Sequence, residues 1–136
     1  MATMKTHVRG LWKGLTREDG YATSAIVIPG ILLFVFVALQ AALWYLGSNV
    51  AQNAAFASYN NARAYESTAE VGQEAGSQII SGMSGFLLNP NVDVQRTATT
   101  VTVTVTGTSP SLIPGVNLPE VKRSITGPVE RWVPAP

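Results

Sequence analysis

The chain has 136 residues and a formal net charge of +1, with no cysteine and a single histidine, His7. That length accommodates one small domain, or one domain plus a membrane segment. So small a charge provides no basic field to attract nucleic acid. The absence of cysteine excludes a disulfide framework and thiolate metal sites. With only one imidazole as well, we expect no metal, no cofactor and no histidine-based catalysis.

The amino-terminal segment, residues 1–20, is polar and basic. Its basic side chains are Lys5, Arg9, Lys13 and Arg17. Two interpretations suit it: an amphipathic helix lying on the inner leaflet of a membrane, or a disordered basic tail that sets the orientation of the adjoining membrane segment. In both, residues 1–20 form a cytoplasmic leader.

An almost continuous apolar run comes after the leader. No charged residue lies between Asp19 and Arg63, and Gln40 is the only strongly polar side chain between Ala25 and Leu46. A helix needs about 20 apolar residues to cross a hydrocarbon core. A cleavable secretory signal has a shorter apolar region and small residues at its exit, and a soluble core helix has a polar face. We therefore predict a transmembrane helix over residues 21–46.

The flanks and a few side chains of this helix predict its orientation in the membrane and its contacts. Basic residues precede the span, so the positive-inside rule places residues 47–136 outside the cytoplasm. Trp44 and Tyr45 suit an aromatic belt at the outer membrane interface. Gln40 either hydrogen-bonds to a partner helix or lies near the outer third of the bilayer. Ala38 and Ala42 give a narrow face on which another helix can pack closely.

Residues 47–90 favour helix that continues the span outside the membrane. An apolar line recurs at four-residue spacing, at Val71, Ala75, Ile79 and Met83, with Ile80 and Leu87 on a neighbouring line. Glycines weaken this stretch and predict a bend or break between residues 66 and 77.

Three glutamates in the same region, Glu66, Glu70 and Glu74, have four-residue spacing and are expected to share one helix face. Clustered carboxylates can serve acid–base chemistry or hold a cation. A solvated helix face is the commoner reason for such spacing, and no histidine accompanies them. We expect a solvated face and no enzymatic activity.

Residues 91–136 change to a period of two, which is typical of strands. Valines alternate with polar residues around Val92 and with threonines over Thr100–Thr106, which predicts half-buried strands with a valine face inward. A third strand is predicted over Val121–Ile125 and Val129–Val133, with residues 127–128 as a point of interruption. The apolar loop 107–119 is expected to cover the sheet edge, and the turns are expected to set the register. The predicted class is α+β: a long amino-terminal transmembrane helix extending outside the membrane, then a small antiparallel sheet.

Several short segments, in this order, carry a resemblance to a known family. They are Arg-Glu-Asp-Gly-Tyr-Ala-Thr at 17–23, Ala-Ile-Val-Ile-Pro at 25–29, Asn-Val-Ala-Gln-Asn-Ala-Ala at 49–55, the threonine–valine run and Gly-Pro-Val-Glu-Arg at 127–131. The chain resembles type IV pilin-like proteins, and among them the TadE-like proteins of Tad (tight adherence) pilus systems. The resemblance implies a single-pass protein of the bacterial cytoplasmic membrane that acts as a minor pilin or pseudopilin. The partners it implies are a prepilin peptidase, other pilin-like subunits and inner-membrane pilus platform proteins.

The same resemblance implies a processing site and shows one departure. In the family, the peptidase cuts after a glycine at the cytoplasmic edge of the helix, and the matching bond here joins Gly20 to Tyr21. The family usually has a glutamate five residues after the cut, where this chain has Ala25. That departure favours an accessory or tip role over a major fibre subunit. The alternative is a signal-anchored envelope protein whose outer domain binds a partner or ligand without joining an appendage.

Overall fold

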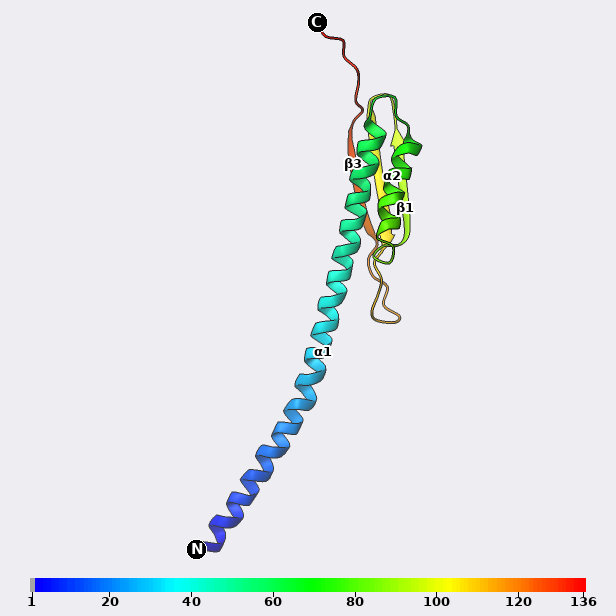
Figure 1. Ribbon diagram of the computed structural model, residues 1–136. Coiled ribbons are helices and arrows are strands. Elements are labelled where there is room, and N and C mark those ends of the chain that lie inside the picture. Colours follow the sequence, from blue (N-terminus) through cyan, green and yellow to red (C-terminus); the bar gives the residue numbers. More distant parts are fainter. Residues whose placement is uncertain (1) are drawn as a thin grey trace. The chain divides into compact units, whose positions relative to one another are not determined.

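The computed structural model describes the backbone of residues 2–136 and the side chains of residues 20–136. The elements in chain order are α1 (Ala2–Arg63), α2 (Ala69–Gly82), β1 (Leu88–Arg96), β2 (Thr100–Thr108) and β3 (Val121–Pro128) (Figure 1). The chain divides into two compact units, Met1–Leu39 and Gln40–Pro136, and α1 contributes to both. The predicted α+β class, a long apolar amino-terminal helix followed by an antiparallel sheet, is confirmed.

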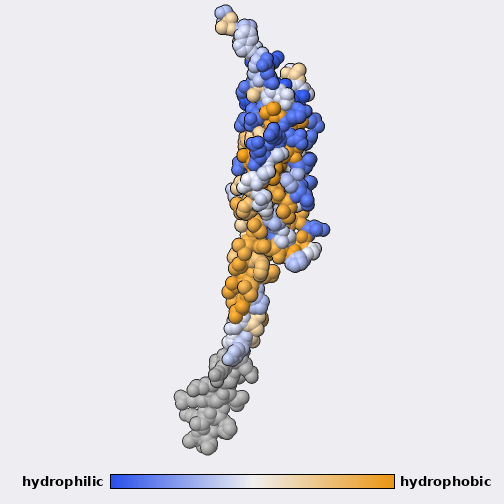
Figure 2. Space-filling view, turned by 45° about the vertical axis from the view of Figure 1, so that its right-hand side comes forward, coloured by the Kyte–Doolittle hydropathy of each residue, from blue (hydrophilic) through white to orange (hydrophobic). Residues whose placement is uncertain are grey.

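The described part of the first unit is an apolar helix with no protein against it. Every side chain from Gly20 to Leu39 is exposed, and Figure 2 shows hydrophobic surface along this stretch. Within the described residues, α1 is the helix long and apolar enough to cross a membrane. Pro29 lies inside it without ending it. The two interpretations of the basic leader concern a segment whose side chains, residues 1–19, lie outside the described residues.

The second unit is built around the central strand of a three-stranded antiparallel meander with the order β1-β2-β3. The inward valines of β2, Val101, Val103 and Val105, are fully buried, whereas its threonines are half-buried on the opposite face. The helices cover the valine face, with α2 against β1 and the carboxyl-terminal part of α1 near β3 (Figure 1). Small residues of α1 close the core: Ala51, Ala54, Ala55 and Ala62. The predicted valine-in, threonine-out alternation of β2 is confirmed.

A tight turn sets the register between β1 and β2, as expected. The backbone N–H of Thr97 donates to the carbonyl of Thr100 at 2.8 Å, and the N–H of Thr100 donates to Oγ1 of Thr97 at 3.0 Å. Arg96 consequently pairs with Val101, and the rest of the ladder continues from that pair.

Two inward glycines add a second constraint on register that the sequence pattern did not indicate. A Cβ at Gly107 would lie 2.6 Å from Cγ of the buried Leu87, and a Cβ at Gly127 would lie 2.7 Å from Cζ of Tyr59. A two-residue slip would bring a larger side chain to one of these positions. The alternating run is therefore held in one register by packing as well as by its turn.

The ends of two strands differ from the prediction. Val129–Val133 is not a strand, because β2 begins at Thr100 and leaves no partner beyond its pair with Pro128. Instead, the N–H of Val129 donates to Thr99 and that of Glu130 to the last carbonyl of α1, at Arg63. The first strand begins earlier than expected, at Leu88. Its ladder is irregular between Leu88 and Asn91, where Pro90 has no N–H to donate.

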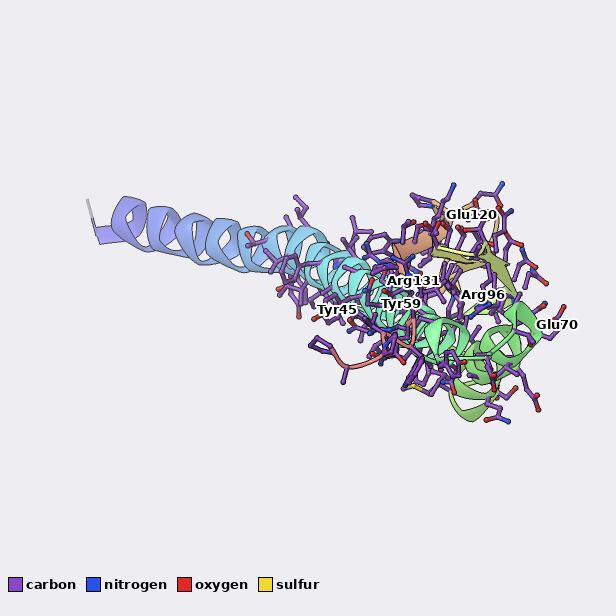
Figure 3. All side chains as sticks on the ribbon, turned by 90° about the horizontal axis from the view of Figure 1, so that it is seen from above. Tyr45, Tyr59, Glu70, Arg96, Glu120 and Arg131 are labelled. Atoms are coloured by element: carbon purple, nitrogen blue, oxygen red, sulfur yellow. The ribbon has the colours of Figure 1, made fainter. Side chains whose placement is uncertain are left out.

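The two helices are separated by residues 64–68, at the amino-terminal edge of the interval where a break was predicted. Glu66 has a positive φ of 58°, and Thr68 caps α2 by accepting from the N–H of Val71. The last carbonyls of a helix have no partner within it. Here Nε of Arg96 donates to the Ala62 carbonyl at 2.8 Å, so β1 supplies the cap for α1 (Figure 3).

Two glycines and Ile80 form the buried line of α2. Its buried residues are Gly72, Gly76 and Ile80, while Val71 is 46% exposed. A Cβ at Gly72 would lie 2.6 Å from Cβ of Ala62 and 2.7 Å from the Ser58 carbonyl oxygen. On the expected line, Ala75 and Ile79 are half-buried, whereas Val71 and Met83 are exposed. Ile80, expected on the neighbouring line, is buried. The glycines of that buried line let the two helix backbones come this close.

Replacing Gly72 by leucine should separate the two helices. The new side chain would meet backbone rather than a movable side chain, so we expect a loss of about 3 kcal/mol in unfolding free energy. Gly82→Leu is the matched control on the same helix, because nothing lies within 4 Å of a Cβ there. Urea unfolding of the full chain in micelles, followed by circular dichroism, measures both. Equal midpoints for the two variants would contradict this packing.

Candidate functional site

The bond expected to be cut lies in the exposed, helical part of α1. Gly20 and Tyr21 are both exposed, and nothing lies within 4 Å of a Cβ at Gly20. The Gly20 carbonyl accepts a hydrogen bond from Oγ of Ser24 at 2.9 Å. A protease needs extended backbone, so cleavage here requires a local unwinding of the helix. Glycine lowers the cost of that unwinding by about 1 kcal/mol relative to alanine.

Gln40, the polar side chain inside the apolar run, is bound within the chain itself. It is only 9% exposed. Its Nε2 donates to the Pro110 carbonyl at 3.0 Å, and its Oε1 accepts from the N–H of Leu112 at 2.8 Å. Both ends of the amide are thus used by the segment between β2 and β3. Ala38 and Ala42 on either side of it are exposed, and their packing against a partner helix stays a prediction.

We call residues 109–119 the proline loop. It contains three prolines and no charged residue: its sequence is Ser-Pro-Ser-Leu-Ile-Pro-Gly-Val-Asn-Leu-Pro. Leu112 is 42% and Val116 is 45% exposed, so these apolar side chains are not buried over the sheet edge as expected. The sequence gives only a weak indication of the contact between Gln40 and this loop: a polar residue lies in an apolar helix, and an uncharged loop lies far along the chain.

The two aromatic residues predicted for a membrane interface lie one turn beyond Gln40. Tyr45 is 64% exposed (Figure 3), and Trp44 is 37% exposed. Their role at an interface stays a prediction. Together with Leu112 and Val116 they make this end of the second unit an exposed apolar region.

Replacing Gln40 by leucine should loosen the proline loop. It removes one donor and one acceptor and leaves the N–H of Leu112 without its partner, at a cost of about 1 to 1.5 kcal/mol. Hydrogen exchange at the amides of Leu112, Ile113, Gly115 and Val116 should accelerate about tenfold, with β2 unchanged. Gln52→Leu on the same helix is the control, because the described residues show no hydrogen bond from the Gln52 side chain to the loop. Equal exchange in the two variants would show that Gln40 does not hold the loop.

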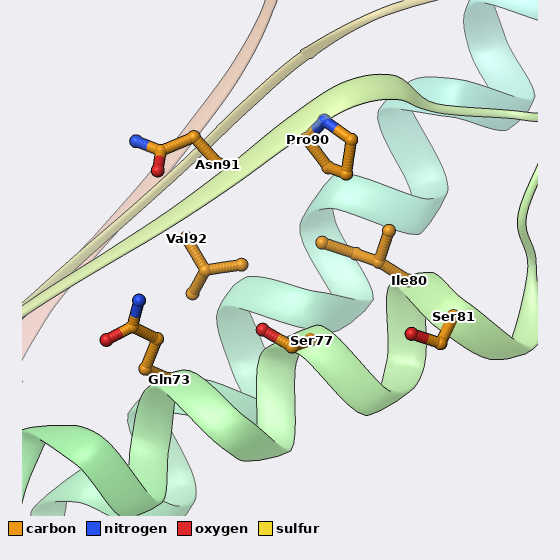
Figure 4. Close-up of a pocket in the computed structure, with 7 residues that line it drawn as sticks. All are labelled: Gln73, Ser77, Ile80, Ser81, Pro90, Asn91 and Val92. Atoms are coloured by element: carbon orange, nitrogen blue, oxygen red, sulfur yellow. The ribbon is translucent and has the colours of Figure 1, made fainter.

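A shallow hollow lies between α2 and β1 in the second unit. Its volume is about 230 Å³, and it is lined mainly by amide and hydroxyl side chains, including Gln73, Ser77 and Asn91 (Figure 4). Ligand pockets are usually about 300–1,000 Å³ and mostly apolar. No charged side chain lines it. The hollow therefore supplies no chemistry that we can assign.

Only two of the three glutamates share a helix face. Glu66 lies in the turn before α2, whereas Glu70 and Glu74 are exposed on α2. Among residues 20–136, no group of three or more histidine, cysteine, aspartate or glutamate side chains is placed to hold a metal ion.

Comparisons with protein-family models, with curated proteins and with solved structures give no match for this chain. Its architecture is nevertheless pilin-like, because a long apolar amino-terminal helix is followed by a small antiparallel sheet.

Proposed function

We propose that this chain is a non-catalytic, pilin-like component of Tad-type (type IVc) pilus assembly or of a related secretion apparatus. In this proposal it is a minor pilin or accessory assembly protein of the bacterial cytoplasmic membrane. Residues 1–20 face the cytoplasm, and the second unit faces outward. The partners are a prepilin peptidase, other pilin-like subunits and inner-membrane platform proteins.

One observation carries the proposal: α1 is exposed and apolar from Gly20 to Leu39, and its carboxyl-terminal part packs against the sheet. The exposed stretch from Gly20 to Leu39 is about 30 Å long at 1.5 Å per residue. That length matches a hydrocarbon core about 30 Å thick. The match supports an anchor that ends at Gln40, six residues earlier than residue 46, where the apolar run ends. Trp44 and Tyr45 would then lie among the lipid headgroups.

Ala25 supports an accessory role. A carboxylate in lipid is costly and is kept where it pairs with a specific group. This chain has no such carboxylate between Gly20 and Arg63. It therefore lacks the ion pair that the family resemblance would assign to self-assembly, and partner helices must be recognised through neutral contacts.

The amino terminus of the mature protein tests the proposal. In cells that have an active prepilin peptidase, mass spectrometry should find a chain that begins at Tyr21. In cells without the peptidase, the same chain should keep residues 1–20. An unprocessed chain in both strains would contradict the pilin-like role and favour the signal-anchored envelope protein.

A further inference from the structure

The proline loop has the properties of a segment that enters a membrane interface. It presents Leu112 and Val116 to the outside, and no charged residue lies between Arg96 and Glu120. Charge resumes with Glu120 and Lys122, at the start of β3. Isolated apolar side chains on a soluble surface are ordinary. An uncharged, proline-rich tip that presents two of them calls for a more specific explanation.

Several backbone groups of the loop are hydrogen-bonded within the chain and so do not depend on water. Unpaired backbone groups are costly away from water. The three prolines have no N–H. The Gln40 side chain donates to the Pro110 carbonyl and accepts from the Leu112 N–H. The Ser111 hydroxyl donates to the Ile113 carbonyl at 2.9 Å. The Val116 N–H closes a turn onto the same Ile113 carbonyl. These contacts lower the cost of moving this part of the loop out of water.

The residue to which the loop is bound indicates that the loop contacts the membrane interface. Gln40 binds it to the first residues of the second unit, at the point where the exposed apolar stretch of α1 ends. We infer that the proline loop is a second membrane contact, which inserts Leu112 and Val116 into the interfacial region of the outer leaflet. This inference rests on the proposed membrane anchor. The interface region reached by such shallow apolar groups is about 5–10 Å deep.

The absence of cysteine from the chain allows a direct test with single labels. Three variants of the full chain, Val116→Cys, Leu33→Cys and Ser124→Cys, are labelled with a nitrobenzoxadiazole fluorophore. All three positions are exposed: in the loop, in the apolar part of α1, and on the outer face of β3. The chains are reconstituted at high dilution in phosphatidylcholine–phosphatidylglycerol vesicles. Quenching is measured with nitroxides at shallow and deep positions on the lipid chains, and with iodide in the outer water.

We expect the Leu33 label to be quenched by deep nitroxides, the Val116 label by shallow ones, and the Ser124 label by iodide alone. Leu112→Cys repeats the loop measurement at a second exposed position. A Val116 label that behaves like the Ser124 label, while the Leu33 label is in lipid, overturns the loop contact and leaves the anchor intact. A Val116 label shielded from iodide and lipid alike indicates a second copy of the chain on the loop and also overturns it. A Leu33 label outside the lipid would remove the anchor itself.

Discussion

Replacing Gly20 by leucine is expected to abolish removal of residues 1–20 while leaving the fold intact. Among the described residues, nothing outside the surrounding helix backbone lies within 4 Å of a Cβ at Gly20, so the larger side chain meets no obstacle from them. Two effects oppose cleavage. Leucine stabilises the helix across the bond by about 0.8 kcal/mol relative to glycine, and the family resemblance implies a peptidase that accepts glycine before the cut.

Gly30→Leu is the matched control for this experiment. Gly30 lies on the same helix, is exposed, and also has nothing within 4 Å of a Cβ. It should be processed like the unmodified chain, since it lies ten residues beyond the bond. The amino terminus of each variant, measured by mass spectrometry from cells with an active peptidase, distinguishes the two outcomes. Continued cleavage of Gly20→Leu at Tyr21 would show that glycine is not what the peptidase recognises.

Replacing Val103 by aspartate should unfold the second unit. Val103 is fully buried at the centre of β2, between Ile125 of β3 and Val94 of β1. An ionised carboxylate placed there without a partner costs several kcal/mol. The total stability of a small domain is only about 5–15 kcal/mol, so most of the folded population should be lost.

Thr102→Asp, the neighbouring position, is the control because successive side chains of a strand point to opposite faces. Thr102 lies on the outer face opposite Gln95 and Thr126, neither of which is charged. It loses only the 3.3 Å hydrogen bond from Thr126, so the change in stability should stay within about 1 kcal/mol. Limited proteolysis of the reconstituted chain should degrade residues 40–136 of Val103→Asp and spare those of Thr102→Asp. Equal protection would mean that the strand faces are assigned wrongly.

The elements that depend on local chemistry were predictable. The apolar run of α1, the alternation around Val103 and the turn residues between β1 and β2 are each set by near neighbours in the chain. The limits of the third strand were not predictable, because β3 ends where its partner begins, at Thr100. The role of Gly72 was not predictable either: glycine weakens a helix, but here it allows close packing of α2 against α1.

Gln40 shows what the sequence determines and what only the tertiary structure determines. By itself, the sequence determines that one polar amide lies in an apolar helix and that a hydrogen-bond partner must be found for it, because an unsatisfied amide in an apolar environment is costly. It does not determine the partner, since the loop that supplies it lies some seventy residues away in the chain. Only the folding of the sheet against α1 brings the Pro110 carbonyl and the Leu112 N–H to that amide. The tertiary structure thus assigns Gln40 to a contact within the chain, and with it the point where the packed part of α1 begins.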